Sequence, residues 1–357
     1  MTKQQKIETF DPSQPGLSDA TIYGLPFTAE ESEIIVVPVP WEVTVSYGAG
    51  ASEGPEAIFD ASFQVDLLHQ QFPDLWKLGI YMDEAPEHWK LLSDQYKADA
   101  QPIIQALEEG KVIKEIPALH KKLEEINQAT TRLHNEVKNH IMEWQKQGKL
   151  VILLGGDHST PLGYYEALAT QYNNFGILHF DAHMDLRIAY EGFTHSHASI
   201  MYNAIQLPQI TKLVQVGIRD FSQQEVEVIQ GTDKVKVYTD SDLKEKLFEG
   251  KSWQNLCDDI IAQLPQDVCI SFDIDALQRW YCPNTGTPVP GGLSFEQATY
   301  LIDKLANSGK NIIGVDLVEV APGEDDWDGN VGARLLFHLC GAFAKNKGLN
   351  VGKKVSF

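Results

Sequence analysis

The sequence predicts an α/β protein built around a mainly parallel β-sheet. The first observation is a series of continuous apolar runs, rich in Val and Ile, at 34–39, 150–154, 176–180, 212–217, 235–238, 268–272 and 312–318. Continuous rather than alternating runs are typical of strands that are buried on both faces. The second observation is that helix-like segments separate several of these runs, at 160–172, 241–264 and 294–308. Alternating strands and helices favour a parallel sheet with helices on both sides.

Two segments stand outside this alternation. Residues 1–30 are polar and rich in turn-forming residues, so we expect an N-terminal arm, and residues 31–357 then form a single domain. Within that domain, residues 84–149 interrupt the pattern as a helical insertion. Apolar residues recur there at steps of three, four and seven, which predicts a long amphipathic helix between Pro117 and Gly148. The insertion is either a helical hairpin packed on the sheet, which we favour, or part of a subunit interface.

The composition excludes several classes of function. The 357 residues include 29 basic and 50 acidic side chains, which gives a net charge of −21. Nucleic acids and anionic membranes both bind basic surfaces, so neither is expected as a partner. No apolar run reaches the roughly 18 residues of a membrane span, and the first residues lack the apolar core of a signal peptide. The four cysteines form no Cys-x-x-Cys pair, so we expect reduced thiols and a cytoplasmic protein.

Polar residues that could bind metals or take part in catalysis follow four of the predicted strands. The segments are Gly155–Ser159, Asp181–Asp185, Asp273–Asp275 and Glu319. In open parallel sheets, ligands bind at the carboxyl ends of the strands. We therefore expect two histidines, four of the aspartates and one glutamate to meet at one rim of the sheet. His179 lies just inside its strand, and we interpret it as a buried core histidine.

These residues are the ligand types of a metal centre. Five carboxylates at one rim repel one another unless a cation neutralises them. Two histidines and four aspartates are too many ligands for one tetrahedral zinc ion, but they suit two ions that share bridging carboxylates. An oxygen-rich ligand set favours Mn²⁺ over Zn²⁺, with Ni²⁺ or Co²⁺ as alternatives. A pair of such ions activates water, so the pattern predicts a hydrolase.

The same segments resemble a known family. Gly155–Ser159, Phe180–Asp185 and Ser271–Asp275 are similar to the three signature segments of the ureohydrolases, which include arginase, agmatinase and formimidoylglutamase. The loop Thr285–Gly292 resembles the loop that follows the third signature. The resemblance extends from about residue 34 to 345, broken by the insertion. It implies a three-layer arginase-like fold, a binuclear manganese-type centre, and release of urea or formamide from an amidino substrate.

The resemblance also implies a role for each matching residue. Six residues match the ligands of two metal ions: His158, Asp181, His183, Asp185, Asp273 and Asp275. Among these, Asp181 and Asp273 match the bridging carboxylates. Glu319 matches the carboxylate that pairs with the guanidinium group, and a planar cation favours such a partner in a water-poor site. His197 matches a histidine of a mobile loop that transfers protons.

The identity of the substrate is less clearly indicated. Arg187 stands where arginases typically carry an asparagine, which disfavours arginine as the substrate. In formimidoylglutamase-like sequences, an arginine at this position could pair with a substrate carboxylate, although a purely structural ion pair is an alternative. The segment 190–197 is more similar to an agmatinase loop.

Aromatic residues near the third signature suggest a narrow pocket. Gln278 and Arg279 replace a usual Asp-Pro pair, and Trp280 follows them. Trp280 and His195, together with Tyr47, could narrow the pocket and favour a short substrate, even guanidine itself. The alternative is that these aromatic residues form a subunit contact.

These observations predict a metal-dependent hydrolase that releases urea from a small cationic guanidino compound. Agmatine or a small guanidine is our first choice of substrate, and two divalent ions per subunit, Mn²⁺ before Ni²⁺, are the expected cofactors. The alternatives are hydrolysis of formimidoylglutamate, a non-catalytic metal-bound regulatory protein, and a mononuclear zinc enzyme of the histone-deacetylase type. The last would leave Asp181, Asp185 and Asp273 without their shared roles. We also expect a homo-oligomer, either a trimer or a hexamer.

Overall fold

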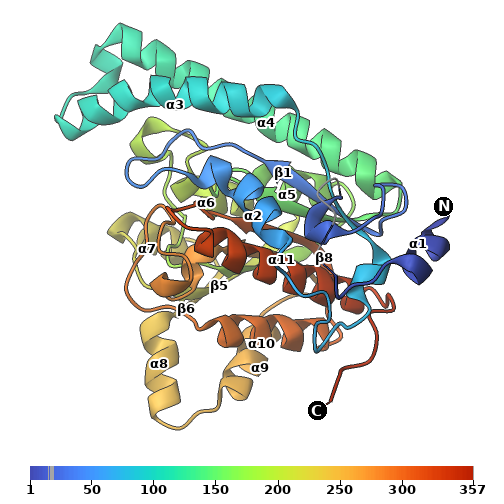
Figure 1. Cartoon of the computed structure of the whole chain (residues 1–357). Helices are drawn as coiled ribbons and strands as arrows, with labels where there is room; N and C mark the ends of the chain where they lie inside the picture. Colours follow the sequence, from blue (N-terminus) through green and yellow to red (C-terminus); the bar gives the residue numbers. More distant parts are fainter. Residues whose placement is uncertain (15, 17–19, 357) are drawn as a thin grey trace.

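The centre of the fold is a parallel sheet. The computed structural model describes residues 1–14, 16 and 20–356 (Figure 1). In this part of the chain the sheet has eight strands in the order β2-β1-β3-β8-β7-β4-β5-β6, and all neighbouring pairs are parallel. The strands are β1 (Ile34–Val39), β2 (Ile80–Met82), β3 (Leu150–Gly155), β4 (Phe175–Phe180), β5 (Ile210–Ile218), β6 (Val235–Thr239), β7 (Asp267–Asp273) and β8 (Asn311–Val318).

Helices connect these strands. The α-helices are α1 (Lys3–Thr9), α2 (Gly54–Ser62), α3 (Glu87–Glu108), α4 (Pro117–Lys146), α5 (Leu162–Ala169), α6 (Ile200–Gln206), α7 (Gln223–Gln230), α8 (Asp240–Phe248), α9 (Trp253–Ala262), α10 (Phe295–Ala306) and α11 (Trp327–Asn346). The expected helix at 241–264 is two helices, α8 and α9. Gly250 lies between them with φ of 93°, a left-handed conformation that glycine adopts at little cost, and Ser252 caps α9.

Two apolar cores cover the two faces of the sheet. Residues alternate between them along each strand: Ile34 and Val36 of β1 belong to one core, and Ile35 and Val37 belong to the other. Helices α2, α9, α10 and α11 complete the first core, while α3, α4, α5 and α6 complete the second. The predicted three-layer α/β fold with a parallel central sheet is therefore confirmed.

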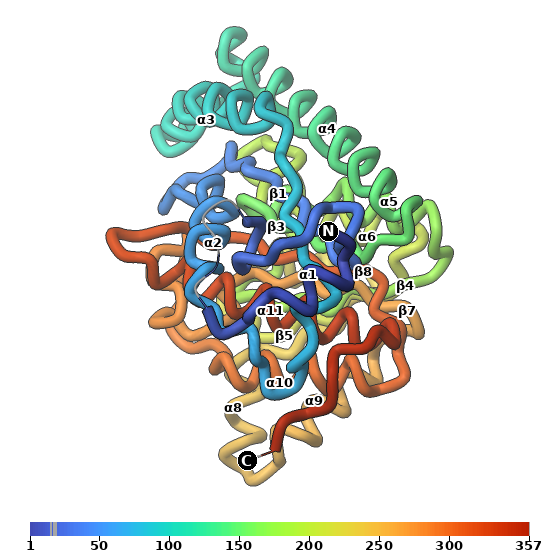
Figure 2. Tube along the Cα trace, turned by 45° about the vertical axis from the view of Figure 1, so that its right-hand side comes forward, coloured from blue at the N-terminus to red at the C-terminus, as the bar shows by residue number. Residues whose placement is uncertain are grey.

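The insertion at 84–149 forms the two longest helices of the described chain. Helices α3 and α4 run side by side along the top of the molecule in Figures 1 and 2. Pro117 is the first residue of α4, and Gly148, with φ of 78°, follows its end. The apolar stripe of α4, including Ile126, Leu133 and Val137, is buried in the second core. The insertion thus packs against the body of the domain.

The N-terminal segment is only partly a surface feature. Helix α1 has no buried residue, and its Lys6 forms an ion pair with Glu31 at 2.6 Å. Ile22 and Leu25, in contrast, are fully buried in the first core. The end of the segment expected as an arm therefore contributes to the core.

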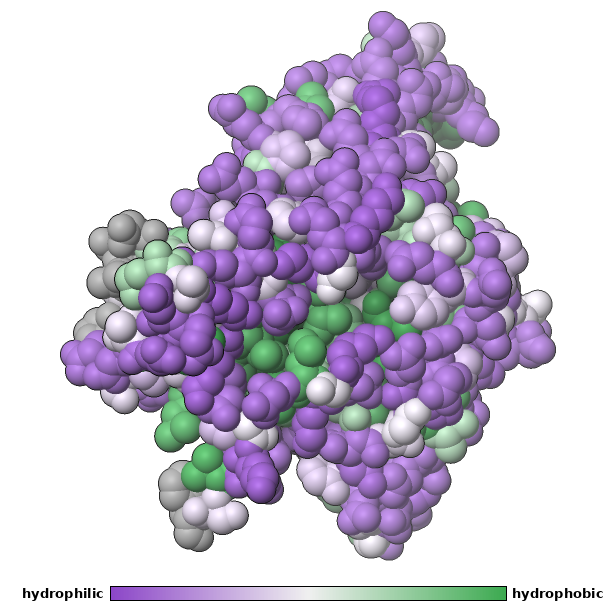
Figure 3. All heavy atoms as spheres, turned by 90° about the vertical axis from the view of Figure 1, so that its right-hand side faces the viewer, coloured by the Kyte–Doolittle hydropathy of each residue, from purple (hydrophilic) through white to green (hydrophobic). Residues whose placement is uncertain are grey.

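The surface is largely hydrophilic on one face of the molecule. Figure 3 shows hydrophilic residues over most of the face seen there, with apolar residues gathered near its centre. No helix of the described residues is both long and apolar enough to cross a membrane.

Candidate metal centre and active site

The order of the strands brings together the segments that carry the candidate metal ligands and Glu319. Strands β3, β8, β7 and β4 are consecutive neighbours, and all run in the same direction. Their carboxyl ends therefore form one continuous rim: Asp273 is the last residue of β7, and His158, Asp181 and Glu319 follow β3, β4 and β8. This is the position where open parallel sheets bind ligands.

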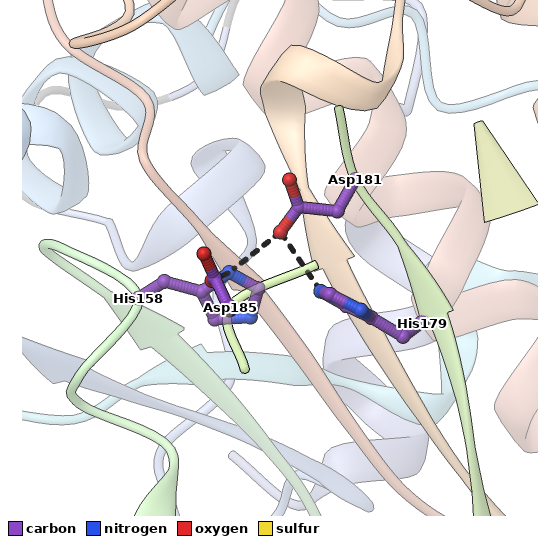
Figure 4. A group of neighbouring side chains, drawn as sticks. All are labelled: His158, His179, Asp181 and Asp185. Carbon is purple, nitrogen blue, oxygen red and sulfur yellow. Dashed lines mark hydrogen bonds and ion pairs between the residues drawn. The ribbon is translucent and has the colours of Figure 1, made fainter. Parts of the chain in front are cut away.

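His158 is at the centre of a buried cluster. Its Nδ1 atom lies 3.1 Å from Oδ2 of Asp181, 3.2 Å from Oδ2 of Asp185 and 3.2 Å from Oδ2 of Asp273. All four side chains are buried, and Figure 4 shows His158, Asp181 and Asp185 pointing toward one another. Nδ1 has no hydrogen-bond partner among the described residues. A buried nitrogen facing three carboxylates without a partner is the arrangement expected of a metal ligand.

A second group lies beside the first. Nδ1 of His183 is 3.1 Å from Oδ2 of Asp275 and 3.5 Å from Oδ1 of Asp181. Ligand atoms of Asp181, His183 and Asp275 all lie within 4.8 Å of one another, close enough to hold one ion. Asp181 belongs to both groups, with one carboxylate oxygen toward each. The donor atoms therefore fit two neighbouring ions that share a carboxylate.

The pKa values show that this cluster is short of positive charge. Burial, followed by the charges of Asp275 and Asp181, raises the pKa of Asp273 well above its usual value. Burial, followed by the charge of Asp181, raises the pKa of Asp185 to about 7. Burial alone lowers the pKa of His183, but the nearby Asp275 and Asp181 raise it to about 12. Without ions the cluster retains protons, and divalent cations would supply that positive charge instead.

Hydrogen bonds behind the cluster fix the tautomer of His158. Its Nε2 lies 3.0 Å from Oγ of Ser271, and Ser271 donates its hydroxyl proton to Oδ1 of Asp316 at 2.8 Å. Tyr165 donates to the other oxygen of Asp316 at 3.0 Å. Because Ser271 has already given its only proton, its oxygen accepts one from Nε2. Nδ1 is consequently deprotonated in neutral His158 and presents a lone pair to the carboxylates.

His179 is the site residue whose contacts the sequence did not reveal. It is fully buried, as expected of a core histidine, but its Nε2 lies 2.8 Å from Oδ2 of Asp181 (Figure 4). Gln215 donates to Nδ1 of His179 at 3.0 Å, so Nε2 carries the proton and donates to Asp181. The available signal was the spacing of two residues, which puts both side chains on the same face of a strand. His179 thus orients a carboxylate that both groups share.

Glu319 is held in a strained position above the cluster. Its φ of 64° is left-handed, which costs a non-glycine residue free energy. Its amide donates to Gly156 O at 2.8 Å, and its Oε1 accepts the amide proton of His158 at 2.8 Å. Burial, followed by repulsion from Asp273 and Asp157, raises its pKa well above the usual value. A cation placed beside this carboxylate would relieve that penalty.

A cavity of 420 Å³ opens over the cluster. His183 and Asp185 line it from the cluster, and His197, Arg187, Asp220 and Glu225 line its walls. Burial, followed by the charges of His183 and His158, lowers the pKa of His197 to about 4. The structure thus brings His197 and both groups to a single cavity.

Arg187 is already partnered within the cavity. Its guanidinium carbon lies 4.7 Å from the ring centre of Tyr190, in cation–π contact. Its Nε is 3.9 Å from Oε2 of Glu225, a buried carboxylate that also accepts from the amide of Leu186. Arg187 therefore forms a structural ion pair and also lines the cavity, so both roles considered from the sequence fit its position.

Two residues expected at the pocket do not line the cavity. Trp280 lies on the surface with 64% of its area exposed, and its carbonyl accepts from Nε1 of Trp327. His195 points toward the insertion, where its Nε2 lies 3.1 Å from Oγ1 of Thr131. Short 3₁₀ turns at Ile274–Ala276 and Arg279–Tyr281 redirect the chain after the third signature and carry Trp280 away. Tyr47 does line the cavity, although its side chain is largely exposed.

The comparisons with known proteins agree with this geometry. The family model described as "Arginase family" matches residues 32–341. The chain is 29% identical to the N(1)-aminopropylagmatine ureohydrolase of Thermus thermophilus over 323 residues, covering 90% of this chain and 93% of that protein. It is 28% identical to the agmatinase of Bacillus anthracis over 303 residues, covering 84% and 87%. The crystal structure of the agmatine ureohydrolase of Thermoplasma volcanium aligns with a TM-score of 0.70 and 21% identity, covering 97% and 99%. The chain therefore belongs to the arginase family, as its signature segments indicated.

Proposed function

We propose that the protein hydrolyses a guanidino compound and releases urea, using two divalent ions. The observation that carries the proposal is the pair of overlapping His–Asp groups, joined through Asp181, that the 420 Å³ cavity reaches through His183 and Asp185. A regulatory protein that only bound a ligand would have no use for two adjacent ion sites on an accessible cavity. Membership of the arginase family supports the same reaction class.

We assign the ligands of the two ions from the two groups. One ion takes His158, Asp181, Asp185 and Asp273, and the other takes Asp181, His183, Asp273 and Asp275. The unpartnered Nδ1 of His158 supports this assignment, and the oxygen-rich ligand set supports Mn²⁺ first and Ni²⁺ second. When bound, a pair of such ions supplies a hydroxide nucleophile at neutral pH by lowering the pKa of water.

Two further residues act on the substrate. Glu319 and His197 both line a smaller cavity of 20 Å³ beside the main one. The Glu319 carboxylate accepts the N–H groups of the guanidinium and holds its carbon in place. His197, which is neutral at pH 7 because its pKa is lowered to about 4, takes up the proton released by the attacking nucleophile and passes it to the leaving amine as the C–N bond breaks. Because Nδ1 of His197 faces Thr44, we assign this transfer to Nε2.

A cationic substrate with an extended tail fits the cavity best. Asp220 and Glu225 add negative charge to the walls, which favours an ammonium group at the far end of the substrate. The volume exceeds what guanidine alone requires, and Trp280 does not narrow it. Two of the relatives are named for agmatine or for aminopropylagmatine, both of which combine a guanidinium with a cationic tail. We therefore place agmatine-like substrates ahead of guanidine.

Formimidoylglutamate is the second candidate. Arg187 lines the cavity and could bind a substrate carboxylate. The nearby Glu225 competes for the same guanidinium, which weakens this alternative. A carboxylate-bearing substrate would have to displace that contact.

A substrate panel tests the proposal. The chelator-treated protein would be reloaded with Mn²⁺ or Ni²⁺ and incubated with agmatine, guanidine, arginine, guanidinobutyrate and formimidoylglutamate, with urea and formamide as the measured products. We expect urea from agmatine only when ions are restored. If formimidoylglutamate is the one compound hydrolysed, with formamide as the product, the second candidate is the substrate. Undiminished urea release by the chelated protein, once metal analysis shows that it holds no ions, would refute the binuclear mechanism.

A further inference from the structure

We propose that the helical insertion positions His197 for proton transfer, with Thr44 as the residue that contacts it. The inference rests on the role proposed above for His197. It follows from two sets of contacts, one made by α3 and one by α4, that reach the two loops around this histidine. Neither set involves the metal cluster.

Helix α3 holds the loop that follows β1. The amide of Glu42 donates to Oγ of Ser93 at 2.8 Å, and the carboxylate of Glu42 forms an ion pair with Lys97. Glu42 is 1% exposed, and its other oxygen accepts the amides of Gly50 and Ala51 at 2.8 and 3.1 Å. One buried carboxylate therefore ties both ends of the segment 42–51 to the insertion.

The same loop touches His197. Thr44 lies two residues after Glu42 and is buried. Its Oγ1 atom is 3.3 Å from Nδ1 of His197, and it donates to Oγ of Ser196 at 3.3 Å. No other side chain of the described residues makes a hydrogen bond to the ring of His197. The placement of the segment 42–51 thus sets the orientation of the ring.

Helix α4 holds the loop that carries His197. Asn127 donates to the carbonyl of Gly192 at 3.2 Å and accepts the amide of Thr194 at 2.9 Å. Gly192 has a left-handed φ of 86°, and a Cβ atom there would come within 2.9 Å of Leu123. The left-handed backbone favours glycine here, and a side chain would also have to displace the end of Leu123. Helix α4 therefore fixes the loop at 190–199, whereas helix α3 fixes the segment 42–51.

The polar contacts of the insertion indicate that it does more than cover the second core. The apolar faces of α3 and α4 already bury the second core through residues such as Ile103 and Ile126. Glu42, Ser93, Lys97 and Asn127 are polar, and their hydrogen bonds end on the two loops. If the insertion served only to cover the sheet, removing one of these polar contacts would leave turnover per bound substrate unchanged.

Kinetics on matched variants test the inference. Lys97→Met and Thr44→Val should each lower kcat about 10-fold with KM within about twofold, because a small misplacement of a proton-transfer group slows the reaction without weakening binding. Lys97→Arg and Thr44→Ser should restore most of the loss. The matched control is Lys122→Met, which removes an α4 lysine whose partner, Asp99, lies on α3 and which touches neither loop. A kcat for Lys97→Met and Thr44→Val equal to that of Lys122→Met would overturn the proposal.

Hydrogen–deuterium exchange supplies a readout that does not need turnover. Lys97→Met should speed exchange in the segment 42–51, and Asn127→Ala should speed it in 190–199, each by at least about 10-fold relative to the wild type. Asn135→Ala is the control for Asn127, since its side chain bonds only within α4. If exchange changes as expected but no variant or wild-type protein releases urea, the proposed function has failed while the insertion still holds the loops. Unchanged exchange in both segments would refute the positioning role itself.

Discussion

Substitution of Glu319 by glutamine tests the guanidinium site most directly. The amide has almost the same size as the carboxylate, and its oxygen can still accept the amide proton of His158, a contact of 2.8 Å. The local backbone and the neighbouring cluster should therefore survive. What is lost is the negative charge of a side chain that is only 8% exposed.

The size of the effect follows from that burial. Removing one partner of a buried, hydrogen-bonded charge pair costs about 2–5 kcal/mol. Since about 1.4 kcal/mol corresponds to a factor of ten, kcat/KM for agmatine should fall by about 30-fold to about 5,000-fold. Burial and the charges of Asp273 and Asp157 already oppose ionisation of Glu319, so the guanidinium is the partner that stabilises its charged form.

The assay combines urea release with metal analysis. Glu319→Gln should keep two ions per subunit, because Glu319 is not among the assigned ligands. Glu324→Gln is the matched control, since it makes the same change on an exposed residue five positions later and should leave kcat/KM unaltered. An unchanged kcat/KM for Glu319→Gln, with both ions retained, would show that the guanidinium binds elsewhere.

Three further predictions concern ion binding, stability and substrate choice. Asp273→Ala removes the proposed bridging carboxylate and should reduce the ion content and abolish turnover. The control, Asp267→Ala at the other end of β7, should keep both ions. A full complement of ions with normal turnover in Asp273→Ala would contradict the assignment. Burial, followed by the charge of His195, lowers the pKa of His134 from 6.5 to about 3, so the unfolded chain binds a proton that the native protein rejects. The contribution of His134 to the free energy of unfolding is complete above pH 6.5 and falls by about 2 kcal/mol by pH 5. In urea unfolding, the free energy of unfolding of His134→Gln should therefore fall about 2 kcal/mol less than that of the wild type between pH 7 and pH 5. Equal losses in the two proteins would refute this prediction. Trp280→Ala should leave the ratio of kcat/KM for agmatine and guanidine within about twofold, because its ring lies outside the cavity, and a larger shift would return Trp280 to the pocket.

The strands were predictable because most are buried on both faces. All seven apolar runs correspond to strands of the sheet. The strand β2 was not predicted, since only three residues at the edge of the sheet form it. Helix α11 was also missed because 15 of its 20 residues are buried, so its sequence has no polar face to reveal a helical period.

The meeting of the cluster residues at one rim was predictable for a different reason. They lie within short segments directly after strands, so local spacing and strand direction suffice to bring them together. Contacts such as that between Thr44 and His197 join residues 153 positions apart, and no local pattern encodes them. Trp280 lies only five residues after Asp275, yet the 3₁₀ turns at 274–276 and 279–281 place it outside the lining of the cavity.

The place of β8 in the sheet has a consequence for the order of folding. Among the described residues, β8 is the last strand, yet it lies between β3 and β7 and is the only strand that joins the β2-β1-β3 half to the β7-β4-β5-β6 half. During synthesis, the two halves each emerge with an unpaired inner edge that must wait until residues 311–318 leave the ribosome. Pairing across such long separations in the chain is slow, and unpaired edges invite association with other chains. The rim that carries the His–Asp cluster spans both halves, so it is complete only after β8 has paired with β3 and β7.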